Sequence, residues 1–289
     1  MHRWLDRAGR VAQQSVAGQL QGIGQSEEVG TDGLWARLRG GAQRVVLLLA
    51  DSVTGLLRSP RVAKEEDSVG PWQRLFELAR QAGLDWDRLR GVTSDRAQGV
   101  IASLRQTLAG MQHQRCVWQI WRNLASDLAQ AAAQAAAEAA SDLGEQAREQ
   151  MRGELVALID GVIDAQSYKQ AEAARVTVLS HSQGAAIDHF LNEQLVHILV
   201  YLVAYYAGLQ RVTPGWYGRD FRLRLSRGRH HGSDQRLERA ALVWAICHNF
   251  EPAQWRSERK RHYRHPGQSS LQVAGAPPGK ISDRDALGV

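Results

Sequence analysis

A continuous apolar run, Arg44 to Ala50 (RVVLLLA), limits most strongly how this chain of 289 residues can fold. Only a covered sheet hides such a run from water, so we predict a buried strand. The pair Gly40-Gly41 just before it predicts a hairpin turn, and Thr54-Gly55 after it predicts a second turn toward a third strand. The strand before the Gly-Gly turn contains Asp32, which the pattern places in a half-buried position on a rigid support.

A second carboxylate ends another short strand about sixty residues later, in the segment Arg90 to Asp95 (RGVTSD). Pro71 opens an amphipathic helix between the two strands, and Gly83 marks its end. An order of strand, helix and strand predicts a parallel crossover, which puts Asp95 at the carboxyl end of its strand. Two aspartates on neighbouring strands can meet and share a divalent cation.

Composition excludes several classes of protein. No run reaches the ~18 apolar residues that a membrane-spanning helix needs, so we expect no membrane partner. The first ten residues carry charge and lack the apolar core of an export signal. Two cysteines, Cys116 and Cys247, form neither a disulfide framework nor a zinc site by spacing. A reducing cytoplasm is the resulting expectation.

Positive charge is concentrated in one segment. Residues 208–265 hold 13 Arg or Lys against 5 Asp or Glu, whereas the whole chain has a net charge of only +6. Tryptophans and tyrosines lie among these charges, as in surfaces that bind the phosphate backbone of DNA. A solvated basic helix face or a disordered basic tail is the structural alternative. The candidate DNA-binding residues are Arg219, Arg222, Arg224, Arg227 and Arg229.

Several short motifs together resemble one family. They are Thr31-Asp32-Gly33, the turn Asp51 to Gly55, Thr93-Ser94-Asp95, the segment Arg115 to Leu124 (RCVWQIWRNL), and the basic string Asn249 to Ser269. With them the chain resembles the DDE transposases of bacterial insertion sequences. One departure is Gln119, three residues after Cys116, where some of these enzymes have His.

The resemblance implies an α/β fold: a ribonuclease-H-like mixed sheet with a helical insertion and a basic helical C-terminal segment. It implies metal-dependent strand cleavage and transfer by two Mg²⁺ ions, with Asp32 bridging both ions and Asp95 holding one. The third acid is expected near Asp220, with Glu238 as the next candidate on the outer face of a core helix, or it has been lost. The implied partners are DNA, as element ends and target, and further copies of the chain on that DNA. The implied location is the bacterial cytoplasm, at the nucleoid when DNA is bound.

The same resemblance divides the chain into five parts. We expect a leading helix in 1–29, the first part of the catalytic core in 30–124, an all-helical insertion in 125–207, basic closing helices in 208–250, and a basic, flexible tail in 251–289. Nothing before the first strand resembles an end-recognition module. We therefore expect an N-terminally truncated or degenerate copy.

Two other functions fit parts of the sequence. The chain can be a non-catalytic DNA-binding remnant of a transposase. Alternatively, Val176 to Ala186 (VTVLSHSQGAA) is close to the strand, elbow and helix of an α/β serine hydrolase with Ser182 as nucleophile. Ser180 replaces the expected first glycine of the elbow, and the preceding Ala-rich residues favour helix, so a helix-to-helix turn is the competing interpretation. Asp220 and His248 complete a triad by chain order only.

Overall fold

Two units make up the chain, which we analysed as a computed structural model. One unit comprises Met1–Gln112 and Thr213–Val289, and the other comprises His113–Val212. The structure describes residues 2–95, 97–124, 129, 133, 144–181, 190–203, 231–250 and 268–276. None of the helices in these described ranges is long and apolar enough to cross a membrane.

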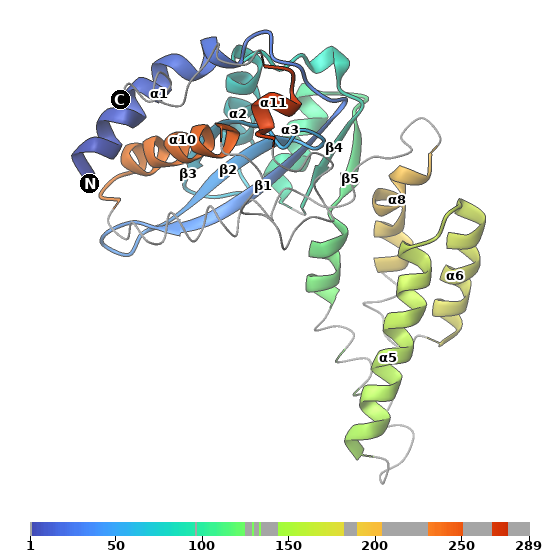
Figure 1. Cartoon of the computed structure of the whole chain (residues 1–289). Coiled ribbons are helices and arrows are strands. Elements are labelled where there is room, and N and C mark those ends of the chain that lie inside the picture. Colours follow the sequence, from blue (N-terminus) through green and yellow to red (C-terminus); the bar gives the residue numbers. More distant parts are fainter. Residues whose placement is uncertain are drawn as a thin grey trace. The chain divides into compact units, whose positions relative to one another are not determined.

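A five-stranded mixed sheet has the strand order β3-β2-β1-β4-β5, so β1 is its central strand (Figure 1). The strands are β1 (Glu28–Arg37), β2 (Gln43–Asp51), β3 (Leu57–Ala63), β4 (Gly91–Ser94) and β5 (Gln112–Arg115). Strands β1, β2 and β3 are antiparallel, whereas β4 runs parallel to β1. The chain is therefore an α/β protein, as the sequence predicts.

Turns fix the register of the hairpins. Gly40 and Gly41 both have positive φ (97° and 92°) between β1 and β2, a conformation that glycine adopts without strain. After β2, the buried carboxylate of Asp51 accepts hydrogen bonds from the backbone N–H groups of Val53 and Thr54, at 3.0 and 2.8 Å. Its other oxygen accepts one from the N–H of Ser26 at 2.6 Å. This aspartate therefore holds the second turn together.

The third strand is longer than the short strand around Arg61 to Ala63 that the sequence predicts. It extends over Leu57–Ala63 and contains Pro60. Proline lacks a backbone N–H, but β3 is an edge strand, where one missing donor is tolerated. A register irregularity opposite Leu47 to Leu49 accommodates this part of the strand.

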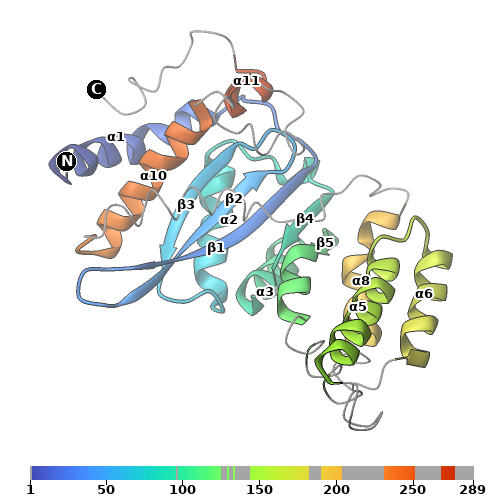
Figure 2. The ribbon, with the colours of Figure 1, turned by 60° about the horizontal axis from the view of Figure 1, so that its bottom comes forward.

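Helices cover both faces of the sheet (Figures 1 and 2). On one face α2 (Val69–Gln81) and α3 (Gln98–Thr107) bury Val45, Leu47 and Leu49, and η1 (Trp86–Arg88) follows α2. On the other face α10 (Asp234–Phe250) buries Val46 and Leu48. The side chains of β2 alternate between these two cores, which explains why the whole run is apolar.

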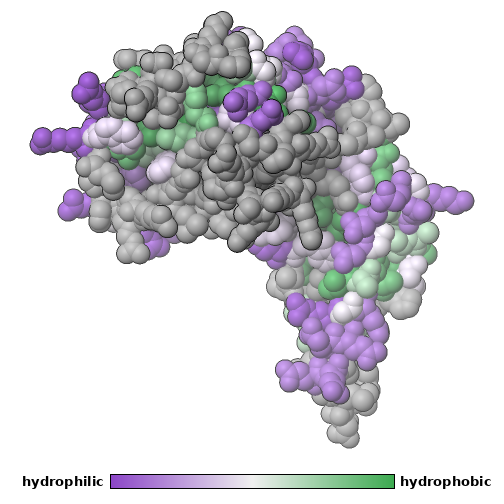
Figure 3. All heavy atoms as spheres, in the orientation of Figure 1, coloured by the Kyte–Doolittle hydropathy of each residue, from purple (hydrophilic) through white to green (hydrophobic). Residues whose placement is uncertain are grey.

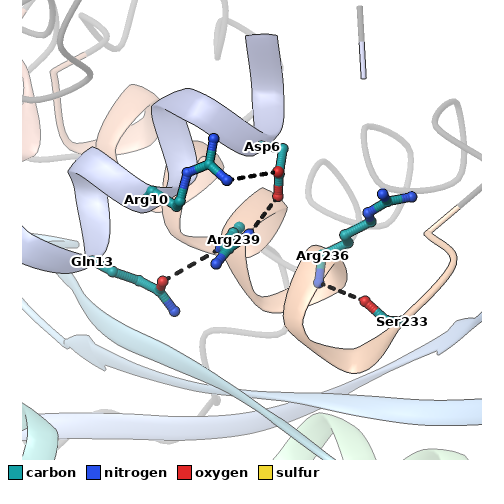
Figure 4. Close-up of polar contacts among 6 residues, drawn as sticks. All are labelled: Asp6, Arg10, Gln13, Ser233, Arg236 and Arg239. Atoms are coloured by element: carbon teal, nitrogen blue, oxygen red, sulfur yellow. Dashed lines mark hydrogen bonds and ion pairs between the residues drawn. The ribbon is translucent and has the colours of Figure 1, made fainter. Parts of the chain in front are cut away.

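The first and last long helices of this unit pack against each other. Helix α1 (His2–Leu20) runs beside α10, and the Asp6 carboxylate accepts hydrogen bonds from Arg239 at 2.6 Å and Arg10 at 3.3 Å (Figure 4). A Cβ on Gly9 would lie 2.4 Å from the Cβ of Arg239. The missing side chain of Gly9 therefore permits the close helix contact.

Part of the segment expected to be a flexible tail is folded. Residues 268–276 contain α11 (Ser270–Val273), which begins with a capping box formed by Ser269 and Gln272. Leu271 and Ala274 are buried in a cluster with Leu20 of α1. The expectation of a flexible tail is therefore wrong for these residues, because apolar side chains here complete a small core.

The second unit is helical where the structure describes it beyond β5. Its elements are α5 (Gly144–Ile163), α6 (Tyr168–His181), η2 (Phe190–Gln194), α8 (Leu195–Ile198) and η3 (Val200–Leu202). Helices α5 and α6 lie side by side (Figure 1). Residues such as Ile159, Val178 and Ile198 form its apolar core. Hydrophilic side chains cover the end where α5 begins (Figure 3).

Two expectations for this unit need correction. The sequence predicts one apolar helix over Asp188 to Ala207, but residues 190–203 form three short pieces of different helical pitch. Trp118, expected in the core, is 57% exposed, and the guanidinium carbon of Arg122 lies 5.3 Å from its ring centroid. Trp121 does pack against the core. Equal helical spacing does not distinguish the exposed tryptophan from the packed one.

The contact at Gly9 gives a test of the α1–α10 packing. We expect Gly9→Ala to lower the free energy of unfolding by about 1–3 kcal/mol, because the added methyl group overlaps Arg239. Gly70→Ala in α2 is the matched control, since nothing lies within 4 Å of its Cβ position. That variant should be neutral or up to about 1 kcal/mol more stable. Urea unfolding measures both, and equal effects would contradict the close packing.

Candidate active site

Two aspartates lie at equivalent positions on neighbouring parallel strands. In the pairing of β1 with β4, Val29 lies opposite Val92 and Gly30 opposite Thr93. Asp32 is two residues beyond Gly30, and Asp95 is two residues beyond Thr93. Asp32 pairs with Leu48, so it lies on the face of the sheet that α10 covers, whereas Asp95 directly follows the last residue of β4. This is the point where β4 ends and β1 continues without that neighbour.

Backbone N–H groups orient both carboxylates. Asp32 is buried, with 6% of its surface exposed, and its Oδ1 accepts a hydrogen bond from the N–H of Gly33 at 3.0 Å. Asp95 Oδ1 accepts one from the N–H of Ala97 at 2.9 Å, just before α3 begins. A strand supports one carboxylate and a turn into a helix supports the other, so each has little freedom to move.

A third carboxylate, Glu66, packs against Gly33 and Trp35 of β1, which lie on the face of the sheet opposite to Asp32. It is in the connection between β3 and α2, and its backbone carbonyl accepts a hydrogen bond from Trp72 Nε1 at 2.8 Å. Its side-chain Oε2 accepts one from Trp35 Nε1 of β1 at 3.3 Å. A Cβ on Gly33 would lie 2.0 Å from Glu66 Oε1. Glu66 therefore occupies the space that a side chain at position 33 would fill.

The three acids interact electrostatically. The pKa of the Glu66 carboxyl is raised from 4.5 to about 8, mainly by burial and also by the negative charges of Asp95 and Asp32. A hydrogen bond between Glu66 and Asp95 also favours the protonated form, whereas the Trp35 indole opposes it. Like charges at close range disfavour a second ionisation.

Sequence reasoning missed Glu66 and interpreted Ser59 to Val69 as a polar loop. Two signals were available. The acidic run Glu65-Glu66-Asp67 lies between a strand and a helix that begins near Pro71, where a connection crosses the end of the sheet. The glycine next to Asp32 leaves room for another side chain. Neither signal identifies which of the three acids turns inward.

Glu238, the next candidate for the third acid, lies elsewhere and faces inward rather than outward. Its Oε1 accepts a hydrogen bond from Arg61 at 2.6 Å, and its Oε2 accepts one from the N–H of Val62 at 3.1 Å. The expectation of an outer-face position is therefore wrong. Position 238 meets the edge strand β3, and the carboxylate attaches α10 to that strand.

The remaining candidates divide into two groups. Asp220, the five arginines from Arg219 to Arg229, and Ser182 lie outside the residues that the structure describes. Cys116 and Gln119 are buried at the start of the second unit.

Val176 to His181 are the last residues of α6, whereas a hydrolase elbow needs a strand there. The strand expected by the hydrolase alternative is therefore wrong.

The donor set suits a hard divalent cation. Within the described ranges, no three His, Cys, Asp or Glu side chains are already arranged to hold a metal ion. Magnesium, however, retains several waters and needs only one or two carboxylates. Asp32 and Asp95 provide such oxygens, and Glu66 Oε1 is a buried oxygen without a hydrogen-bond donor. The oxygen chemistry of Asp32 and Asp95 therefore suits magnesium.

The crowded carboxylates predict a pH-dependent stability. The folded chain keeps the Glu66 proton up to about pH 8, whereas an unfolded glutamate loses it near 4.5. The free energy of unfolding therefore falls as the pH rises from 4.5 to about 8, because the unfolded chain gives up the Glu66 proton and the folded chain keeps it. In EDTA at pH 9 we expect the melting temperature of Glu66→Gln to lie a few degrees above that of the original chain. For a chain of this size, each kcal/mol of added stability raises the melting temperature by about 2–4 °C. Below pH 4.5 the difference should vanish.

The neighbouring variant Glu65→Gln is the control, since it removes the same charge from an exposed side chain. Its melting temperature should follow that of the original chain at every pH. A gain for Glu66→Gln that does not change with pH would contradict the electrostatic origin of the effect.

Comparison with known proteins gives one match. Residues 38–177 match the family model described as "Transposase, Mutator family". The matched segment makes up slightly less than half of the 289 residues. The matched segment contains Glu66 and Asp95 and begins shortly after Asp32. No curated protein in the comparison matches the chain. The family match supports the interpretation of this chain as a transposase, an enzyme class that cleaves and transfers DNA.

Proposed function

We propose that this chain is a DDE-type transposase of an insertion sequence, with a ribonuclease-H-like core that performs phosphodiester transfer. The observation that carries this proposal is the placement of Asp32 and Asp95, at equal distances beyond paired residues of two parallel strands. In this proposal both carboxylates would hold one cation near the end of β4. The Mutator-family match over 38–177 supports the same function.

Asp32 and Asp95 are the residues that would hold magnesium. When bound, a pair of such ions activates the attacking oxygen and stabilises the leaving oxygen in phosphodiester transfer. The N–H groups of Gly33 and Ala97 each donate to one oxygen of these aspartates and so orient the two carboxylates. In this proposal Asp32 would hold both ions and Asp95 would hold one of them. Asp220 is the proposed third acid of the reaction.

DNA is the proposed substrate and partner. The five arginines between 219 and 229 would contact phosphates, which gives affinity with little base recognition. A transposase must bring together element ends and target, so we propose that several copies of the chain assemble on DNA. A copy without the third acid would keep the binding and lose the cleavage, and the experiments below distinguish these states.

Loss of either aspartate should abolish cleavage. We expect Asp32→Asn and Asp95→Asn each to reduce Mg²⁺-dependent nicking of DNA carrying the element ends by at least about 100-fold. Even removing a residue one step away from a metal costs about 10–100-fold. Asp87→Asn is the matched control, because Asp87 is an exposed acid of η1 in the same unit. Gel assays with labelled DNA measure the nicking rate.

The outcomes separate three cases. Nicking that persists in both aspartate variants would contradict the proposed site. Salt-sensitive DNA binding without cleavage in any divalent metal would identify a non-catalytic remnant. Hydrolysis of an ester substrate that disappears in Ser182→Ala would point to the hydrolase alternative.

The basic segment predicts a strong dependence of DNA binding on salt. Replacing Arg219, Arg222, Arg224, Arg227 and Arg229 by Gln should weaken binding. It should also lower the slope of log K against log salt by about 0.9 for each lost phosphate contact. Fluorescence anisotropy at several salt concentrations measures the slope. Replacing Arg74, Arg80, Arg88, Arg90 and Arg105 by Gln removes the same charge elsewhere and should leave the slope unchanged.

A further inference from the structure

The hairpin of β1 and β2 is fastened near its tip. Strand β1 continues beyond its pairing with β4, and the hairpin extends away from that strand (Figure 2). The backbone N–H of Arg39 in the turn donates to the carbonyl oxygen of His231 at 3.0 Å. Arg44 Nε of β2 donates to Asp234 Oδ1, at the start of α10, at 2.7 Å. These two contacts limit the motion of the hairpin.

The two faces of this hairpin differ in character. Leu34 and Leu38 are buried in the cluster beneath α10. Trp35 and Arg37 occupy alternate positions of β1, so they point to the opposite face, and both are exposed. The indole of Trp35 is prominent, with 44% of the residue exposed. Arg39 in the turn is exposed as well. The outward face therefore presents one indole and two guanidinium groups.

Trp35 is held in one orientation although it is exposed. Its Nε1 donates to Glu66 Oε2 at 3.3 Å, and the carbonyl oxygen of Glu66 accepts a hydrogen bond from Trp72 Nε1 at 2.8 Å. Across the hairpin, Trp35 lies opposite Val45, a buried residue of β2. A ring whose orientation is set beforehand loses little conformational entropy when a ligand packs against it. This indole is therefore suited to stacking on a flat ligand.

The two arginines favour an anionic ligand. In the described part of the chain neither Arg37 nor Arg39 forms an ion pair, whereas Arg44 of the same hairpin binds Asp234. The planar fork of donors in a guanidinium group matches the oxygens of a phosphate. Alternate residues of a strand are about 7 Å apart. A phosphate attached to a nucleotide on Trp35 would therefore be within reach of the long Arg37 side chain.

We propose that this outward face of the β1–β2 hairpin binds an unpaired segment of DNA, with a base stacked on Trp35 and phosphates bound by Arg37 and Arg39. The inference rests on the proposed function, because DNA is the partner proposed there. A duplex presents only the edges of its bases in the grooves, so an indole stacks on a base where the strands are separated. The hairpin would thus add base stacking to the phosphate contacts proposed for residues 219–229.

The experiment measures, in EDTA, binding of the full chain to a fluorescent single-stranded oligonucleotide of mixed sequence and to a duplex of the same sequence. We expect Trp35→Ala to weaken binding to the single strand by about fivefold or more and to leave duplex binding unchanged. Trp35→Phe retains an aromatic ring and should keep more of the affinity. Trp4→Ala is the matched control, because Trp4 in α1 of the same unit is 47% exposed. It should bind both DNAs as the original chain does.

The arginines are tested through the salt dependence of binding. Replacing Arg37 and Arg39 by Gln should weaken binding to the single strand and lower the slope of log K against log salt by about 0.7 for each lost phosphate contact. Replacing Arg74 and Arg88 by Gln removes the same charge from exposed positions of the same unit and should leave the slope unchanged. Because Arg37 and Arg39 are exposed, this pair tests the site even if Trp35→Ala fails to fold.

The outcomes separate the hairpin site from the proposed function. Equal losses in Trp35→Ala and Trp4→Ala, or equal losses for single strand and duplex in Trp35→Ala, would overturn stacking on Trp35. Unchanged binding in all hairpin variants, with nicking lost in Asp32→Asn and Asp95→Asn, would overturn the hairpin site and leave the proposed function intact. Selective loss of single-strand binding in the hairpin variants, in a chain that cleaves no DNA with any divalent metal, would support the hairpin site and contradict the proposed catalysis. An original chain that binds neither DNA would overturn both.

Discussion

Burial of β2 on both faces is the constraint on which the sheet unit depends. Val45, Leu47 and Leu49 enter the core beneath α2 and α3, and Val46 and Leu48 enter the core beneath α10. No single layer of helices could cover both sets, so the sheet must lie in the middle of three layers. This arrangement fixes β1 beside β2, and β1 in turn presents Asp32. The position of the candidate site thus follows from apolar packing.

The site itself lies where the pairing of β1 with β4 stops. Beyond that point Glu66, from the connection between β3 and α2, packs against Gly33 and Trp35 of β1. Ionisation of Glu66 lowers the stability of the fold, because burial and the nearby charges of Asp95 and Asp32 disfavour its charged form, as its raised pKa indicates. Strongly shifted groups of this kind are frequent at functional sites.

The sequence predicted much of the fold from local signals. The apolar run, the Gly-Gly turn and the helix that begins near Pro71 have strong short-range causes, so β1, β2 and α2 were predictable. The inward turn of Glu66 and the Arg61 pairing of Glu238 were not, because each depends on a contact between distant segments. Trp118 and Trp121 show the same limit, since helical spacing alone does not reveal which side of a helix finds a partner.

Helix α10 covers Val46 and Leu48 but follows β3 by roughly 170 residues of sequence. Synthesis proceeds at about 5–20 residues per second, so α10 is made roughly 10–30 s after β3. One apolar face of the hairpin strands is uncovered during this time. The nascent chain must keep that face from associating with other chains throughout this interval. The insertion of the helical unit between the two halves of the sheet unit thus lengthens the time for which this apolar face is uncovered during translation.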